Sequence, residues 1–169
     1  RGIGLELASQ LHQKGTEVIA VCRQRSAELD GLGIEVLEGV DLGDATSISD
    51  LPNRLDNRPI DLLINNAGRL RRDNLDQPDD EEVLQQFLIN ALAPLRLTRA
   101  LRPLFRSGTK VAHITSRMGS IGDNTSGGMY GYRMSKAALN AAGKSLALDL
   151  QRDGISVAIL HPGFVRTGM

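Results

Sequence analysis

The sequence lacks several features that define common protein classes. Its single cysteine, Cys22, rules out an internal disulfide and a thiolate metal cluster, and we expect no metal site. It has no tryptophan and only 3% aromatic residues, so stacking on nucleic-acid bases is not expected. No apolar run approaches the roughly 20 residues of a membrane span, and no signal-peptide pattern is present. With a lone cysteine typical of reducing compartments, these absences predict a cytoplasmic protein.

An excess of charge of either sign is also missing. Twenty Lys and Arg residues balance 20 Asp and Glu residues, which gives a net charge of zero. Electrostatic binding to nucleic acid or to an anionic membrane requires clustered positive charge, so we expect neither as a partner. The 169 residues, 41% of them hydrophobic, suffice for one domain spanning 1–169. A small-molecule substrate is the partner that fits these bounds.

Strand-like and helix-like segments alternate along the chain. Short, largely apolar segments predict strands at residues 17–22, 33–42, 59–65, 109–116 and 155–160. Helical spacing or capping signals predict helices at residues 2–14, 46–56, 81–106 and 133–152. This alternation predicts an α/β fold, a doubly wound parallel sheet with helices on both faces. Ligands bind such sheets at the carboxyl ends of the strands.

The first residues carry a glycine pair, Gly2 and Gly4, at the start of a predicted helix. Small residues there let a pyrophosphate approach free N–H groups and the positive end of the helix dipole. A simple tight turn is the alternative. Arg23 directly follows the next strand, where an arginine suits a ribose 2′-phosphate. Arg1 is a second candidate for that phosphate, and we favour NADP over NAD, although both arginines could instead be surface residues.

Tyr132 and Lys136 lie one helical turn apart and therefore on one face. Lowering a tyrosine pKa from near 10 to about 7 requires roughly 4 kcal/mol. A cation about 4 Å away supplies that much as an upper bound at an effective dielectric near 20. The helix N-terminus would add to this by favouring an anion. The spacing therefore predicts an acidified phenol, and a chance pair is the alternative.

Two further polar residues stand at informative positions. Ser116 ends a predicted strand, where its hydroxyl could donate to a substrate oxygen, and Thr115 is its rival because strand neighbours point to opposite faces. Asn90 lies inside the predicted long helix, four residues before Pro94. Because proline has no N–H, the Asn90 carbonyl loses its helical partner and is free to hold a water. The alternative is a tolerated kink with a solvent-facing Asn90.

Together these motifs resemble the short-chain dehydrogenase/reductase family, and its C-factor-like carbonyl reductase branch most of all. They occur in family order: GIG at Gly2–Gly4, NNAG at Asn65–Gly68, Asn90 in FLINALAP, Ser116 in ITSRMGSI, YRMSKAAL at Tyr132–Leu139 and HPGFVRTGM at His161–Met169. The resemblance implies a three-layer Rossmann fold. It also implies that the first strand, the first motif glycine and the C-terminal segment of the family lie outside this sequence.

The resemblance implies a role for each site residue. Tyr132 is the general acid/base, Lys136 lowers its pKa and holds the ribose, Ser116 orients the substrate carbonyl, and the Asn90 main chain holds a relay water. The adenosine side of the cofactor is assigned to Asn65, Ala67, Gly68 and Asp41, and the nicotinamide to Pro162, Gly163 and Thr167. The full set expected to contact NADP is Arg1, Gly2, Ile3, Gly4, Arg23, Asp41, Leu42, Asn65, Ala67, Gly68, Tyr132, Lys136, Pro162, Gly163, Val165 and Thr167.

The expected function is an NADP(H)-dependent oxidoreductase that interconverts a carbonyl and an alcohol. A non-catalytic NADP-binding regulator or signalling protein on the same fold is the alternative, and a chain that does nothing by itself is a third. The sequence departs from the family pattern in a long Ser116-to-Tyr132 interval and in His113, which stands where asparagine is frequent. His113 is expected to be structural. Small residues on the Tyr132 helix and the family habit of helix pairing predict a homodimer or homotetramer, although those small residues could instead contact the sheet.

Overall fold

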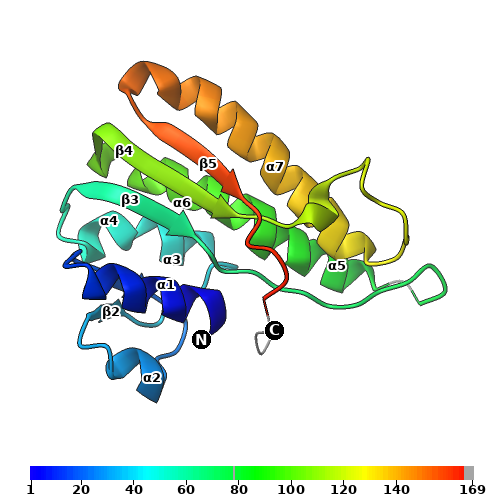
Figure 1. Ribbon diagram of the computed structural model, residues 1–169, viewed down its shortest axis with the longest axis horizontal. Coiled ribbons are helices and arrows are strands. Elements are labelled where there is room, and N and C mark those ends of the chain that lie inside the picture. The colour runs from blue at the N-terminus through cyan, green and yellow to red at the C-terminus, as the bar shows by residue number, and fades with distance from the viewer. Residues whose placement is uncertain (78, 166–169) are drawn as a thin grey trace.

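The computed structural model describes residues 1–77 and 79–165 (Figure 1). The helices are α1 (Gly2–Gln13), α2 (Ala27–Asp30), α3 (Ala45–Ser49), α4 (Leu51–Arg54), α5 (Asp80–Phe87), α6 (Ala93–Leu101) and α7 (Tyr130–Leu150). The strands are β1 (Ile19–Val21), β2 (Glu35–Leu37), β3 (Ile60–Asn65), β4 (Phe105–Ile114) and β5 (Ser156–Leu160). In the described part of the chain, no helix is both long enough and apolar enough to cross a membrane.

Every ladder between these strands is parallel, as the alternation of strands and helices predicts. β1 pairs with β2, and β3, β4 and β5 form a three-stranded sheet in that order. The α/β Rossmann architecture predicted from the sequence is therefore confirmed. One detail differs, because the strands pair as two sheets and no ladder joins β1 to β3 among the described residues.

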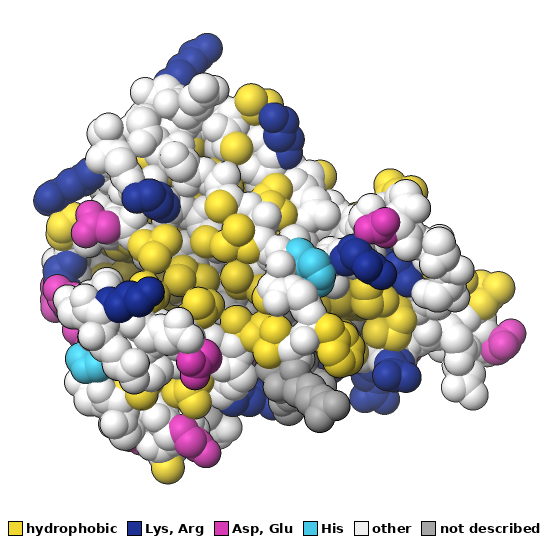
Figure 2. Space-filling view, viewed as in Figure 1, with side chains coloured by type: hydrophobic (Ala, Val, Ile, Leu, Met, Phe, Trp, Pro, Cys, Tyr) yellow, Lys and Arg dark blue, Asp and Glu magenta, His cyan; other side chains and the backbone are white. Residues whose placement is uncertain are grey.

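The main core lies where α3, α4 and α6 pack against the strands. It contains Val40, Ile48, Leu51, Leu55, Ala93, Leu97, Leu101 and Leu104. Figure 1 shows these helices behind the three-stranded sheet and α1 toward the viewer. The near face of that sheet is more open, since Leu62 is 40% and Leu160 47% exposed. Figure 2 shows hydrophobic side chains gathered in the middle of this view.

The single helix expected over 81–106 is wrong, because the chain forms three consecutive elements there. α5 ends at Phe87, a π-helical turn occupies Leu88–Leu92, and α6 begins at Ala93. Pro94 supplies the reason, because it has no N–H to donate to the Asn90 carbonyl. The disruption predicted at this proline is thus a wide helical turn of the kind often found at functional sites. The strand that follows starts earlier than expected, at Phe105.

The helix expected over 46–56 is also divided, into α3 and α4. Pro52 near the start of α4 cannot donate to the carbonyl four residues earlier, so the ladder breaks there. Of the two residues whose sequence suits a cap here, Asp44 and Thr46, Asp44 caps α3 by accepting from the N–H groups of Thr46 and Ser47. The one-turn helix α2 was missed because four residues show no periodicity, although Ser26 caps it through the N–H of Leu29.

The loop after β4 packs closely on α7 at Gly119. A Cβ placed on Gly119 would lie 2.7 Å from the Lys136 carbonyl carbon and 2.9 Å from its oxygen. Because these are backbone atoms of a long helix, they cannot move aside easily. Gly122, in the same loop, would meet nothing within 4 Å. Only the first of these glycines is therefore required for the loop to lie on the helix.

We therefore predict that Gly119→Ala lowers the free energy of unfolding by about 1–3 kcal/mol, the usual cost of overpacking. Gly122→Ala is the matched control, since it lies in open space. Urea unfolding followed by far-ultraviolet circular dichroism measures both. Equal stability of the two variants would contradict the packing described at Gly119.

Candidate active site

The residues predicted to do chemistry converge at the carboxyl ends of the strands. Ser116 follows β4, Tyr132 is the third residue of α7, and Lys136 lies one turn further along α7. Asn90 lies in the π-helical turn, which packs against α7. Figure 1 shows the start of α7 and the ends of β4 and β5 at the same side of the molecule. The fold thus brings together residues from three separate segments of the chain.

Lys136 is buried, with 4% of its surface exposed. Its Nζ donates to the carbonyl oxygen of Ile114 at the end of β4, over 2.8 Å, and lies 5.7 Å from the centre of the Tyr132 ring. Burial disfavours the charged ammonium and lowers the Lys136 pKa to about 8. At neutral pH the lysine therefore remains mostly charged, although burial of this charge is unfavourable.

The phenol of Tyr132 does not show the acidity that its spacing to Lys136 predicts. Burial raises its pKa above the ordinary value for tyrosine, and a hydrogen bond with Ser116 opposes that rise. The expectation of a pKa near 7 is therefore wrong for the protein alone. Loss of water around the phenol outweighs the hydrogen bond with Ser116, and Lys136 directs its Nζ to a backbone carbonyl.

The N-terminus of α7 also contributes less than expected to an anionic phenol. The N–H groups of Tyr130 and Gly131 donate to the Asp73 carboxylate over 2.5 and 2.8 Å. A negative charge already lies at the positive end of this helix and offsets its dipole. At neutral pH the site therefore holds a protonated phenol, which is a proton donor.

The choice between Ser116 and Thr115 is resolved by their partners. Thr115 is buried, and its hydroxyl donates to Oδ1 of Asn140 over 2.7 Å. Ser116 is only partly buried. Its Oγ accepts from the N–H of Met118 over 3.2 Å, and its side chain forms a hydrogen bond with the Tyr132 phenol. The structure places Ser116, not Thr115, beside the phenol.

Asn90 is fully buried, so the alternative of a solvent-facing side chain is wrong. Its Oδ1 accepts from the Arg69 N–H over 2.7 Å, and its Nδ2 donates to the Arg69 carbonyl over 2.8 Å. The same Nδ2 donates to Ser135 Oγ over 2.9 Å, and Ser135 Oγ donates to the Tyr132 carbonyl over 2.8 Å. Asn90 thereby connects the chain after β3 to the helix that carries Tyr132.

His113 and Asn65 form a buried pair on the face of the sheet that meets α7. The side-chain nitrogen of Asn65 lies 3.2 Å from His113 Nδ1. His113 Nε2 and Asn65 Oδ1 have no protein partner among the described residues. Burial, and to a lesser degree the charge of Lys136, lowers the His113 pKa to about 4. The imidazole is therefore neutral at physiological pH, in line with the structural part expected of it.

The glycines of the predicted cofactor motifs lie where close approach is needed. A Cβ on Gly4 would come within 2.5 Å of the Asn66 side chain, so α1 begins directly against the NNAG turn. A Cβ on Gly68 would lie 3.4 Å from Asn90 Oδ1 and 3.9 Å from Lys136 Nζ. A side chain at residue 68 would therefore fill the space in front of the lysine. Gly2 has a φ of 58°, a conformation that suits glycine.

The remaining predicted cofactor residues surround this end of the sheets. Arg1 and Arg23 are exposed, the second just after β1. Asp41 accepts from the Gly43 N–H over 2.8 Å, whereas the Leu42 side chain packs on the core. The other members flank the glycines or follow β3 and β5, and they are Ile3, Ala67, Pro162, Gly163 and Val165. Thr167 lies outside the described residues.

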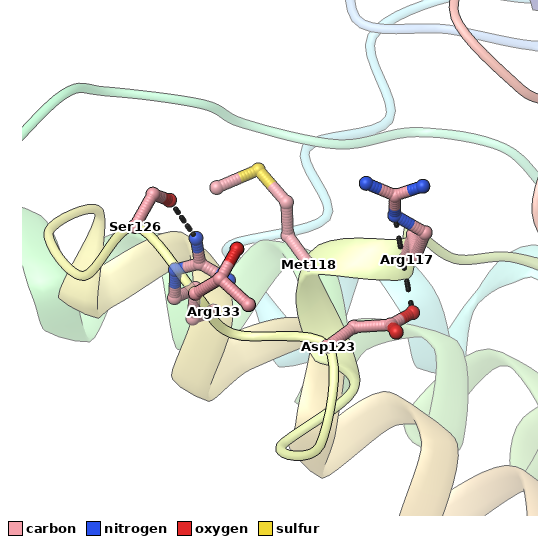
Figure 3. A pocket seen from close by; sticks show the side chains of 6 residues that line it. Arg117, Met118, Asp123, Ser126 and Arg133 are labelled. Atoms are coloured by element: carbon pink, nitrogen blue, oxygen red, sulfur yellow. Dashed lines mark hydrogen bonds and ion pairs between the residues drawn. The ribbon is translucent and has the colours of Figure 1, made fainter.

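A pocket of about 200 Å³ lies in the loop between Ser116 and α7 (Figure 3). Its first lining residue, Arg117, directly follows Ser116 in sequence, and its last, Arg133, directly follows Tyr132. Arg133 donates to Ser126 Oγ over 2.9 Å and holds the loop to the helix, while Arg117 forms a 3.8 Å ion pair with Asp123. The side chains that line it are Arg117, Met118, Asp123, Thr125, Ser126 and Arg133.

Sequence reasoning missed the residues that connect these parts. Asp73 and Gln86 lie outside every motif, and Ser135 lies inside YRMSKAAL without an expected role. Arg69 pairs with the nearly buried Glu82, its Nε 2.7 Å from Oε1, and this ion pair lowers the Glu82 pKa.

The sequence pattern of the family described as short chain dehydrogenase matches residues 1–169. A parallel α/β protein with this arrangement of Ser116, Tyr132 and Lys136 is of the Rossmann class. The chain belongs to the short-chain dehydrogenase family and is an oxidoreductase of that family.

Similar proteins include enzymes and a signal protein. The chain is 44% identical, over 171 residues, to the 1-hydroxy-2-glutathionyl-2-methyl-3-butene dehydrogenase of Rhodococcus sp. (strain AD45), covering all of this chain and 76% of the relative. It is 51% identical, over 114 residues, to the C-signal of Myxococcus xanthus, covering 66% of this chain and 69% of the relative. The predicted resemblance to the C-factor-like branch is thus confirmed.

Among solved structures, a carbonyl reductase from Pseudomonas aeruginosa PAO1 in complex with NADP is 38% identical to this chain. The two superpose with a TM-score of 0.88 over 100% of this chain and 77% of that one. The fold described above is therefore shared with that carbonyl reductase.

The His113 pair generates a prediction about stability and pH. A histidine has a pKa of 6.5 without perturbation and about 4 here, so the unfolded chain binds more protons between these values. This contribution to stability is complete above pH 6.5 and is lost as the pH falls toward 4, by about 3 kcal/mol in total. The stability advantage of wild type over His113→Asn should shrink accordingly.

Chemical unfolding at a series of pH values measures this difference. His12→Asn is the matched control because His12 is exposed on α1, and it should track wild type at every pH. A difference between wild type and His113→Asn that stays constant from neutral to acid pH would contradict the neutral, buried state of His113.

Proposed function

We propose that the protein is an NADP(H)-dependent oxidoreductase that reduces a carbonyl to an alcohol, with Tyr132 as the general acid. One observation carries this proposal. Ser116 forms a hydrogen bond with Tyr132 at the carboxyl end of β4, where the buried Lys136 donates to the Ile114 carbonyl. A charged lysine, a phenol and a hydroxyl seldom share a semi-buried place without a chemical reason, because burying the charge is costly.

The protonated state of the Tyr132 phenol supports the direction of reduction. A reduced carbonyl develops negative charge on oxygen and must take up a proton, and a phenol that is protonated at neutral pH can deliver it. The Ser116 hydroxyl orients the same oxygen by donating a hydrogen bond. As the phenol gives up its proton, the Lys136 ammonium stabilises the phenolate that forms. In the oxidation direction the phenol would have to be deprotonated first.

The residues present fit a dinucleotide. Gly68 leaves open the space in front of Lys136, and Gly4 lets the start of α1 reach the turn after β3. The N–H groups at the start of α1 and its dipole suit a pyrophosphate. The Oδ1 of Asn65 is a buried acceptor at this edge, and none of the residues that the structure describes donates to it. The cofactor supplies a hydride to the carbonyl carbon when it is bound.

NADP is the form we propose, with NAD as the weaker candidate. Arg23 stands just after β1, where a guanidinium can pair with a 2′-phosphate, and Arg1 is close in sequence to the pyrophosphate-binding turn. The NADP complex of the carbonyl reductase from Pseudomonas aeruginosa supports the same choice. A small carbonyl or alcohol is the proposed substrate, and the polar pocket beside Ser116 suits a compound with a polar portion.

We also propose a homodimer or homotetramer in the cytoplasm. Apolar residues are exposed on the outer sides of two helices that pack together, Leu84 (65%) on α5 and Met134 (56%) on α7. Exposed apolar surface of this kind marks association sites. The small residues of α7 serve partly another purpose, since Gly143 packs against Ile159 and His113 of the sheet. The lone cysteine supports a reducing compartment.

A non-catalytic, NADP-binding signalling protein is the second candidate. The 51% identity to the C-signal of Myxococcus xanthus favours it. A protein that only binds would have no need for a buried Lys136 beside a protonated phenol, and we therefore favour the enzyme. Binding of NADPH without turnover of any carbonyl in a broad panel would reverse that preference.

The two tyrosines of the chain provide the direct test. We predict that Tyr132→Phe lowers kcat for carbonyl reduction by about 100-fold or more, the usual contribution of a positioned acid. Tyr130→Phe is the matched control, because Tyr130 is 43% exposed at the start of the same helix, and it should retain wild-type turnover. Assays with NADPH and a panel of reactive carbonyls measure both, and NADH should support slower turnover.

Near-normal turnover by Tyr132→Phe would refute the role of the phenol. Equal loss in both tyrosine variants would also count against it, since it would indicate damage to the start of α7 and no special part for residue 132.

A further inference from the structure

The helix that carries Tyr132 begins in a set of hydrogen bonds made by one residue, Asp73. The Asp73 carbonyl accepts from the Met129 N–H over 3.1 Å. Its carboxylate accepts from Tyr130 over 2.5 Å and from Gly131 over 2.8 Å. Two successive N–H groups thus converge on the Asp73 carboxylate, a third donates to the carbonyl of the same residue, and the next residue in the chain is Tyr132.

The backbone of residues 127–129, directly before α7, has a conformation that must be stabilised by its surroundings. Gly127, Gly128 and Met129 all have a left-handed conformation, with φ of 63°, 61° and 56°. The two glycines adopt it freely, but Met129 carries a Cβ and does not. A residue held in such a conformation persists only when its surroundings fix it. The Asp73 carbonyl bonds directly to the N–H of this residue.

Asp73 is itself held from the far side of the site. It ends the segment 69–73, whose Arg69 backbone is bound in both directions by the buried side chain of Asn90. The Arg71 N–H donates to Oε1 of Gln86, also fully buried, over 3.1 Å. The segment therefore cannot shift without breaking bonds to α5 and to the π-helical turn.

At Gly131 the start of α7 packs closely against Gln86 of α5 and against Asp73, so these segments cannot move relative to one another. A Cβ there would lie 2.6 Å from Gln86 Nε2 and 3.1 Å from Asp73 Oδ2. On its other side, the Tyr132 carbonyl accepts from Ser135, which is bound by Asn90. The main chain at Tyr132 is thus fixed before it by Asp73 and after it by Ser135, and both connections lead back to the same buried asparagine.

We propose that Asp73 is a positioning residue for Tyr132. Its carboxylate fixes the first turn of α7 and its carbonyl supports Met129 in its left-handed conformation, and together they set where the phenol lies relative to Ser116. This rests on the proposed function for its effect on turnover. Its effect on the geometry of Tyr132 stands apart from that function and can be measured without a substrate.

Asp73→Ala and Asp73→Asn test the proposal in the full chain, with Asp76→Ala as the matched control. Asp76 is exposed in the same loop, and the hydrogen bond that it makes to Asn74 uses only its backbone N–H. Asp73→Ala should lower kcat by about tenfold or more, because displacement of a catalytic group by about 1 Å has effects of this order, while KM for NADPH changes little. Asp73→Asn keeps one acceptor oxygen and should fall between, and Asp76→Ala should match wild type.

The second readout is the near-ultraviolet circular dichroism of Tyr132. The chain has no tryptophan and two tyrosines, so in a Tyr130→Phe background the tyrosine signal reports on residue 132 alone. Asp73→Ala should abolish that signal while the far-ultraviolet spectrum persists. If Asp73→Ala does not fold, Asp73→Asn decides by the same two measurements.

The outcomes separate the two claims. Wild type that reduces no carbonyl removes the proposed function, and the Tyr132 signal then decides on Asp73 by itself. In an active wild type, a kcat for Asp73→Ala equal to that of Asp76→Ala overturns the positioning role. A Tyr132 signal unchanged by loss of the carboxylate overturns it in either case.

Discussion

The burial of the Lys136 ammonium is the constraint around which the site is arranged. A charge removed from water destabilises the protein unless polar groups replace the water, and here the Ile114 carbonyl at the end of β4 accepts from Nζ. The absence of a side chain at Gly119 lets the loop lie on the lysine backbone, and the absence of one at Gly68 keeps space open in front of the ammonium. Burial lowers the lysine pKa and raises that of the neighbouring phenol.

A network of buried amides joins the parts of the site that the fold leaves separate. Strand ends alone would bring Ser116 near α7, but they would not fix the start of that helix. Asn90 does so through the Arg69 backbone on one side and Ser135 on the other. The π-helical turn is what places Asn90 there, because an extra residue in that turn changes which side chains face inward. Pro94, in the first turn of α6, leaves the Asn90 carbonyl without a helical partner and is therefore part of the same arrangement.

Much of this could be predicted from the sequence, because local patterns carried it. Apolar strand segments and helix periodicity predicted parallel α/β order, and the four-residue spacing placed Tyr132 and Lys136 on one helical face. Burial could not be read from spacing, which is why the direction of the Tyr132 pKa shift was wrong. Asp73 and Gln86 were missed for a related reason. Their partners lie 57 and 15 residues away in sequence, and no short motif records such contacts. His113 was recognised as structural, but its pairing with Asn65 depends on strand register.

The most direct test of the account is the turnover of Lys136→Met compared with Lys144→Met. Lys144 lies two turns further along α7 and is exposed, so its replacement leaves the site intact. Oxidation of NADPH by a reactive carbonyl is the reaction to follow, with folding checked by circular dichroism. The account predicts a loss of about 100-fold or more for Lys136→Met alone, comparable to loss of a positioned catalytic group. Turnover by folded Lys136→Met equal to that of Lys144→Met would contradict the account.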